Sequence, residues 1–393
     1  MSLLPVTEAQ ARLLALATQL PHEDAPLPSS AHRYTAVDVA ALRTQPAADL
    51  SAMDGYAIRH ADLPGPFRLI GESAAGRAFD GAVAPGEAVR IFTGAYMPPG
   101  ADCVLVQEEA TRDGDAVRLT GEGPAQPGRN VRRKGLDFET GEVLIAAGER
   151  ITPARIAVAA IAGHATLPVR RTVRVAIAAT GDELVAAGSP IADGQLPESN
   201  GLMLAAMLGG LPIEIVDLGI LPDRLDVLTA AFEGVRANVL VTTGGASVGD
   251  HDLVRPALEA AGGTLDFWRI ALRPGKPMMA GRLGTSVILG LPGNPVSAFV
   301  TAELFLKPLV RHLAGARDPF PAMMHVPLGE DLAANDHRTD YLRAELRDGA
   351  AYASTIQDSS MLRTLARSTC LIVRPPLAAA ARAGDSAEIL MLA

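Results

Sequence analysis

Between residues 173 and 312, short apolar runs alternate with segments whose apolar residues recur every three or four positions. The apolar runs predict strands at residues 173–179, 213–218, 239–241, 267–272 and 287–291. The periodic segments predict helices at residues 199–208, 225–235, 252–261 and 295–312. Nearly continuous apolar strands that alternate with helices indicate a parallel sheet covered on both faces. Residues 172–316 are therefore expected to form a doubly wound, mostly parallel α/β domain.

The segments on the N-terminal side of this domain have a different pattern of apolar and polar residues. A capping box at residues 7–10 and the apolar residues that follow predict a helix, and residues 153–163 show a second helical pattern. We expect these pieces, within residues 1–50 and 146–171, to pack together as one helical or linker domain. Residues 51–145 contain short apolar runs broken by Gly, Pro and Asp, which is typical of a β-rich insert.

The pattern changes once more after residue 317. Five short strands are predicted there, at residues 324–328, 341–346, 351–356, 370–373 and 388–392. A small barrel-like C-terminal domain over residues 317–393 is the expected result. The complete fold class is thus a multidomain α/β protein.

Composition narrows the class of protein. A chain of 393 residues needs several domains, and none of its segments has the ~20 uninterrupted apolar residues of a membrane span. Residues 1–5 lack the features of a signal peptide, and the two cysteines, Cys103 and Cys370, are isolated, so a cytoplasmic location is expected. The net charge of -9 argues against nucleic-acid binding.

Four loops of the predicted α/β domain combine glycine or proline with polar residues, and each follows a strand. They are residues 180–184, 242–252, 273–277 and 291–297. Ligands of open α/β sheets bind outside the carboxyl ends of the strands. The four loops therefore predict one ligand site along a single edge of the sheet.

The residue types in these loops favour an anionic ligand. Gly244 and Gly245 let backbone N–H groups approach ligand oxygens, and Asn294 before Pro295 begins a helix whose N-terminus attracts anions. Lys276 offers a point charge to a phosphate or oxyanion. Glu183 and Asp252 can supply oxygen ligands for Mg²⁺. The alternative for each feature is a structural one, since glycines also make ordinary turns and carboxylates also cap helices. The four loops together favour a phosphorylated ligand.

Several motifs resemble the molybdopterin molybdenumtransferase family. They comprise Ser51-Ala52-Met53-Asp54-Gly55-Tyr56-Ala57, Ile91-Phe92-Thr93-Gly94-Ala95, Asn130-Val131-Arg132 through Asp137, Thr180–Leu184, Thr242–Asp252, Pro274-Gly275-Lys276-Pro277 and Leu291–Ser297. The resemblance runs from about residue 5 to the end of the chain. It implies a central domain of the molybdopterin-binding type.

The resemblance also implies an activity. Members of this family insert molybdate into adenylylated molybdopterin and release AMP, and they require Mg²⁺. They form homodimers in which the α/β domain of one subunit and the β-rich insert of the other share a site. The expected partners are adenylylated molybdopterin and molybdate, together with the adenylyltransferase and the apo-molybdoenzymes.

By the same resemblance, individual residues receive roles. Glu183 and Asp252 are the expected Mg²⁺ ligands. The catalytic candidates are Asp54, Thr93, Arg132, Asp137, Asp223 and Lys276. The candidates for binding substrate or molybdate are Gly244, Gly245, Ser247, Arg273, Pro277, Pro292, Asn294, Ser297, Arg343 and Ser360.

The sequence departs from the family at some of these positions. Arg273 stands where the family has Lys, and Ser359-Ser360 where it has Gly-Ser. Gln45-Pro46-Ala47-Ala48-Asp49-Leu50 stands where the family has a stretch rich in Pro, Phe, Asp and Asn. Two alternatives stay open: a molybdopterin adenylyltransferase, whose fold resembles residues 172–312 alone, and a non-catalytic molybdopterin-binding scaffold.

Overall fold

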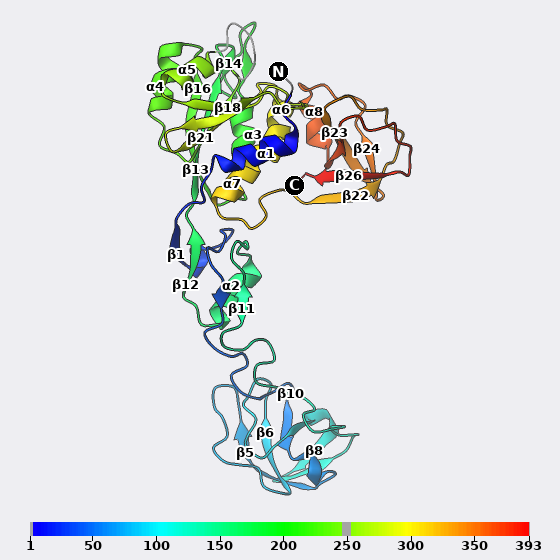
Figure 1. Cartoon of the computed structure of the whole chain (residues 1–393). Coiled ribbons are helices and arrows are strands. Elements are labelled where there is room, and N and C mark those ends of the chain that lie inside the picture. Colours follow the sequence, from blue (N-terminus) through cyan, green and yellow to red (C-terminus); the bar gives the residue numbers. More distant parts are fainter. Residues whose placement is uncertain (1–2, 246–252, 393) are drawn as a thin grey trace.

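The chain is elongated, with its β-rich insert far from the rest (Figure 1). The structure, a computed structural model, describes residues 3–245 and 253–392. The central α/β sheet and the C-terminal sheet lie at one end of the molecule. A narrow segment that contains β1 (His22–Pro26), β12 (Thr166–Arg170) and α2 (Pro153–Ile161) connects them to the insert. Among the described residues, no helix is both long and apolar enough to cross a membrane.

The central sheet has six strands in the order β16-β13-β17-β21-β20-β18. Their bounds are Ile213–Leu221, Val173–Thr180, Val239–Thr243, Ser286–Leu291, Met279–Leu283 and Thr264–Trp268. The first four strands pair in parallel, whereas β20 runs antiparallel to both of its neighbours. β18 therefore points the same way as the parallel strands, and its carboxyl end lies at the same edge of the sheet.

Helices cover both faces of this sheet, as the apolar pattern predicted. Side chains alternate along β17, so that Val239 and Val241 pack with α3 (Asn200–Leu208) and α6 (Pro295–Thr301). Leu240 on the opposite face packs with α4 (Leu225–Glu233) and α5 (Val254–Ala260). A π-helical turn, Ala302–Leu306, continues α6 into α7 (Lys307–Leu313). The α/β architecture is thus confirmed.

The predicted strand at residues 267–272 is wrong in part. The chain leaves the central sheet after Trp268, and β19 (Leu272–Arg273) pairs instead with β23 (Thr339–Arg347) of the C-terminal sheet. Ile270 and Leu272 are both fully buried, which explains the apolar run. Hydrophobicity shows that a segment is buried, but it does not show which sheet the segment joins.

The predicted packing between the two helical segments is also wrong. α1 (Val6–Ala15) buries Val6, Ala9 and Leu13 in the core of the central sheet. α2 packs in a separate core around Ile145 and Leu167. The predicted capping box is absent as well, because α1 begins after Pro5 and Thr7 lies inside the helix, with no side-chain cap on it. An apolar stripe predicts a buried face but leaves its partner undetermined.

The insert forms a six-stranded sheet in the order β7-β4-β6-β5-β9-β8. The strands are Cys103–Val106, Gly55–Ile58, Glu87–Ile91, Phe67–Ser73, Ala116–Leu119 and Ala110–Asp113. Small hydrophobic clusters cover both faces, one with Ile58 and Leu105 and the other with Val89 and Ile91. β10 (Val131–Arg132) pairs with β3 (Leu50–Ser51), and β11 (Val143–Ile145) pairs with β2 (Val39–Ala40), where the chain enters and leaves the insert.

The C-terminal sheet contains the five predicted strands. With β19 they form a six-stranded sheet in the order β19-β23-β25-β26-β22, in which β24 (Ala350–Ala353) pairs with β23. The remaining bounds are Cys370–Arg374, Ser386–Met391 and Met323–Pro327. The short helix α8 (Leu362–Arg367) was not predicted. Tyr341, Leu371 and Leu390 share one hydrophobic core with the central sheet. Closure into a barrel stays a prediction.

Candidate functional site

A cavity of about 740 Å³ opens at the carboxyl ends of the parallel strands, where the sequence predicted a ligand site. The cavity walls come from the ends of β13, β17 and β21 and from the first residues of α3 and α6. Eight predicted residues line it: Glu183, Asp223, Gly244, Gly245, Pro277, Pro292, Asn294 and Ser360. Loops that are far apart in sequence therefore meet around one space.

The backbone conformation and the close contacts at position 244 require glycine. Its φ is +90°, and a Cβ atom there would lie 2.6 Å from the carbonyl oxygen of Thr180. A Cβ on Gly293 would lie 3.6 Å from the Cα of Gly244, so the second and fourth predicted loops come close together. The cavity floor is thus backbone with no side chain in the way, which suits the approach of ligand oxygens.

Carboxylates gather at one side of the cavity. Burial raises the pKa of Asp223, and the negative charges of Asp182 and Glu183 raise it further, while Asp182 also accepts a hydrogen bond from the backbone N–H of Asp223 at 3.0 Å. A cation would relieve this repulsion. Within residues 3–245 and 253–392, no three His, Cys, Asp or Glu side chains are arranged to hold a metal by themselves. One or two carboxylates fit Mg²⁺, which takes its other ligands from substrate phosphates and water.

The start of α3 also lines the cavity, whereas the sequence predicted only a helix there. Asn200 donates from Nδ2 to the carbonyl oxygen of Gly293 at 2.7 Å, and Glu198 accepts from the N–H of Gly201 at 2.7 Å. The Oδ1 atom of Asn200 is buried without a partner in the described chain. The sequence signal that could have located this side of the cavity is the segment between residues 185 and 198. β14 (Leu184–Val185) pairs with β15 (Leu196–Pro197), so this segment brings the chain back to the same edge of the sheet.

A loop of the C-terminal part completes the cavity. Asn294 donates from Nδ2 to the hydroxyl of Ser359 at 3.0 Å, and the N–H of Val296 donates to the Ser359 carbonyl at 3.1 Å. Ser360 is thereby held at the cavity wall, with its hydroxyl donating to Asp358 at 2.6 Å. Asn294 precedes α6 as its N-cap residue, as predicted, but its side chain bonds to the C-terminal loop and not to the helix.

Arg343 supports this loop through hydrogen bonds. Its guanidinium is fully buried and donates from Nη1 to the carbonyl of Asp358 at 2.7 Å and from Nε to Gln357 at 3.3 Å. Burial lowers its pKa, and Nη2 finds no partner among the described residues. Ser297, on the first turn of α6, is also buried. Both residues lie outside the residues that line the cavity.

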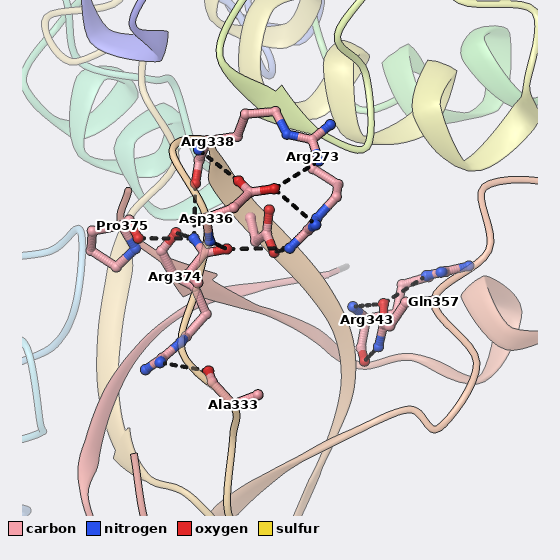
Figure 2. A network of polar contacts seen from close by, with 10 residues as sticks. Arg273, Ala333, Asp336, Arg338, Arg343, Gln357, Arg374 and Pro375 are labelled. Carbon is pink, nitrogen blue, oxygen red and sulfur yellow. Dashed lines mark hydrogen bonds and ion pairs between the residues drawn. The ribbon is translucent and has the colours of Figure 1, made fainter. Parts of the chain in front are cut away.

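Lys276 and Arg273 belong to the loop between β18 and β20. Lys276 is exposed and forms no ion pair with the described residues, whereas Pro277 next to it lines the cavity. Arg273 is held by Asp336 and Asp340 of the C-terminal part (Figure 2). Its charge is therefore already paired.

Two of the predicted residues of the insert, Asp54 and Thr93, contact each other. Thr93 donates two hydrogen bonds to Asp54, and these bonds lower the pKa of the Asp54 carboxyl. Arg132, on β10, and Asp137 are exposed. Figure 1 shows β6 and β10 at the far end of the chain from the cavity. Within one chain the two sets of predicted residues therefore do not meet. Ser247 and Asp252 lie outside the described residues.

The described site can now be compared with known proteins. Three family models match: "MoeA N-terminal region (domain I and II)" at residues 4–163, "Probable molybdopterin binding domain" at 176–312, and "MoeA C-terminal region (domain IV)" at 325–392. The molybdopterin molybdenumtransferase of Haemophilus influenzae is 35% identical over 373 residues, which cover 92% of each chain. That of Bacillus subtilis is 32% identical and covers 99% of this chain and 94% of its own length. The crystal structure of the molybdopterin biosynthesis moeA protein from Pyrococcus horikoshii is 26% identical, with a TM-score of 0.85 and complete coverage of both chains.

Proposed function

We propose that this chain, which belongs to the molybdopterin molybdenumtransferase family, inserts molybdate into adenylylated molybdopterin and releases AMP. The observation that carries the proposal is the cavity at the strand ends. It combines a backbone floor at Gly244, the carboxylates Glu183 and Asp223, and the N-termini of α3 and α6. Helix N-termini and bare backbone suit phosphate groups, and the carboxylates suit a divalent cation that accompanies them.

The groups at the cavity and beside it have separate roles in this proposal. Glu183 and Asp252 would hold Mg²⁺, which would withdraw negative charge from the substrate phosphates. The helix N-termini at Asn200 and Asn294 hold the phosphate oxygens and stabilise the negative charge that develops on them. Lys276, whose ammonium group is unpaired among the described residues, attracts molybdate.

The reaction needs no covalent bond to the protein. An oxygen of molybdate attacks the phosphorus of the AMP unit, and the bond from that phosphorus to the oxygen of the pterin-side phosphate breaks, which leaves molybdate bound to AMP through that oxygen. The two dithiolene thiols then bond to molybdenum while two Mo–O bonds break. One of these oxygens leaves on AMP, and the other leaves as water with the two thiol protons. The chain contributes by aligning molybdate with the phosphate and by excluding water from the cavity.

The insert supplies the second half of the site from a partner subunit. Arg132 is on β10, which Figure 1 shows at the far end of the chain from the cavity together with β6, whose strand ends two residues before Thr93. Next to Asp54 and Asp137 in the sequence, the insert exposes the large apolar side chains of Met53, by 43%, and Leu136, by 67%. Exposed apolar residues beside functional polar ones are typical of an interface, and a homodimer would bring the insert to the partner's cavity.

The test is an assay of AMP release from adenylylated molybdopterin with and without molybdate. We expect release that depends on both molybdate and Mg²⁺. The rival activity, adenylyl transfer, is tested by incubation with molybdopterin and ATP, where formation of adenylylated molybdopterin would replace our proposal. A scaffold without activity would bind the pterin but release no AMP under either condition.

A further inference from the structure

Arg273 connects the central α/β sheet with the C-terminal sheet. It is the second residue of β19, which pairs in parallel with β23 so that Arg273 lies opposite Asp340. Leu272 before it is fully buried in the shared core. The N–H of Thr339 donates to the Ala271 carbonyl at 2.9 Å, and this bond continues the pairing. The backbone of Arg273 is thereby fixed against the C-terminal sheet.

The guanidinium of Arg273 has three acceptors in the C-terminal part. Nη2 donates to Asp340 in a short contact and to Oδ1 of Asn335 at 3.2 Å, while Nη1 donates to Asp336 at 3.2 Å. The Asp340 side chain is only 4% exposed, and its Oδ1 has no partner in the described chain. Arg273 is thus the counterion of a buried carboxylate, and removal of one member of such a pair is costly.

Two of the three acceptors, Asn335 and Asp336, belong to a turn that other hydrogen bonds also hold (Figure 2). Asn335 donates from Nδ2 to the carbonyls of Arg338, Arg374 and Pro375 at 2.8 to 2.9 Å. Asp336 accepts hydrogen bonds from the guanidinium and the N–H of Arg338, and these bonds lower its pKa to about 2. Arg273 therefore docks against a turn whose shape does not depend on Arg273 alone.

What Arg273 holds in place is the loop that leads to the cavity. Residues 274–277 follow it directly, and the N–H of Ile270 donates to the carbonyl of Lys276 at 3.1 Å, which closes the loop. A Cβ on Gly275 would lie 2.5 Å from the methyl group of Thr301, so the loop is packed tightly on α6. Arg343 lies three positions after Asp340 on β23.

We propose that Arg273 is a positioning residue that acts through Asp340 and Asp336, and not a ligand of molybdate or of the substrate phosphates. The pair Arg273–Asp340 locks the loop bearing Lys276 and Pro277 against the strand that bears Arg343. Two carboxylates already neutralise the guanidinium, which leaves it poorly suited to attract a second anion. The functional part of this inference rests on the proposed reaction, whereas the coupling between the two residues does not.

The test is a double-mutant cycle with Arg273→Met, Asp340→Asn and the combined variant. The readouts are the Kd for molybdate alone by calorimetry, the KM for molybdate and kcat of AMP release, and the thermal midpoint. We expect each single substitution to weaken molybdate binding by about tenfold, because the loop with Lys276 is displaced in both. The combined variant should be no weaker than the weaker single variant, since both changes break the same pair. Arg273→Lys, which keeps the charge, should recover part of the affinity.

The other outcomes overturn the proposal. A loss of affinity in Arg273→Met with none in Asp340→Asn would identify Arg273 as a direct ligand. Losses that add in the combined variant would mean that the residues act independently. A lower kcat or thermal midpoint with unchanged Kd and KM would reduce the pair to a structural role. Arg12 and Asp266, a pair of the same chemistry at 2.9 Å between α1 and β18, provide the control, and their substitution should leave the affinity unchanged.

Failure of the proposed reaction would be visible separately. If the unaltered protein releases no AMP, the proposed function falls, while the calorimetric cycle with molybdate still decides whether Arg273 acts through Asp340. If AMP release is normal and the cycle shows no coupling, the positioning role falls alone.

Discussion

Thr93 donates two hydrogen bonds to the same oxygen of Asp54, from its backbone N–H at 2.7 Å and from its hydroxyl at 2.8 Å. The two bonds hold the pKa of Asp54 below its usual range, first through the backbone bond and then through the hydroxyl. Thr93→Val should remove the hydroxyl bond alone and raise the pKa of Asp54 part of the way, whereas Thr93→Ser should leave it low. A titration of the Asp54 carboxyl by NMR tests this, and equal pKa values in the two variants would contradict it.

Glu183→Gln should increase the Mg²⁺ concentration needed for half-maximal AMP release by about tenfold or more, because a neutral amide is a poorer ligand for a hard cation. Asp226→Asn is the matched control. Asp226 lies a few residues after Asp223 but points to solvent, where its side chain is 68% exposed and pairs with Arg224. A Mg²⁺ titration of both variants decides the point, and equal Mg²⁺ requirements would exclude Glu183 as a ligand.

Gly244→Ala should abolish AMP release and destabilise the fold, since the new methyl group would meet the Thr180 carbonyl at 2.6 Å. Gly262→Ala separates this clash from the effect of backbone conformation, because Gly262 has a φ of +86° with nothing within 4 Å of a built Cβ. The strain of a positive φ alone costs roughly 1–2 kcal/mol. Denaturant unfolding should show that loss for Gly262→Ala, with activity retained, and a larger loss for Gly244→Ala. Similar losses in both would refute the close approach.

Neither cysteine should react with thiol reagents in the folded protein. Cys103 and Cys370 are both fully buried. Burial, with the nearby charge of Asp102, raises the pKa of Cys103 to about 12, so the reactive thiolate is scarce near pH 8. Reaction with a chromogenic disulfide should therefore be negligible without denaturant and should reach both thiols in its presence. Rapid labelling of the native protein would show that one of the two sites opens.

The α/β core could be predicted from sequence because its signal is local and strong. The strand that ends at Thr243 begins with three apolar residues and is buried at every position, so its pattern indicates an interior place in the sheet. The loops at Gly244 and Asn294 could be assigned to one edge, since parallel strands place all their carboxyl ends there. That rule needs no knowledge of side-chain contacts.

The wrong predictions about α1 and about the segment around Leu272 share a different cause. The stripe of α1 and the run around Leu272 both predicted burial correctly, yet their partners lie far along the chain, and periodicity carries no information about them. The family resemblance placed Arg273 among the residues expected to bind substrate or molybdate. Its ion pairs with Asp336 and Asp340, more than 60 residues away, were not predicted. Long-range pairing of charges cannot be seen in a single sequence.

The central claim is that the cavity of one subunit works with the insert of another, and mixed dimers test it most directly. Asp54→Ala and Glu183→Ala should each be inactive alone, because one alters the insert and the other the cavity. When the two are unfolded together and refolded in equal amounts, a shared site leaves one intact site in each mixed dimer. Molybdate-dependent AMP release should then return to about a quarter of the unaltered level. No recovery, with mixed dimers confirmed by differential tags, would contradict the claim, since a site within one chain would then carry a defect in every subunit.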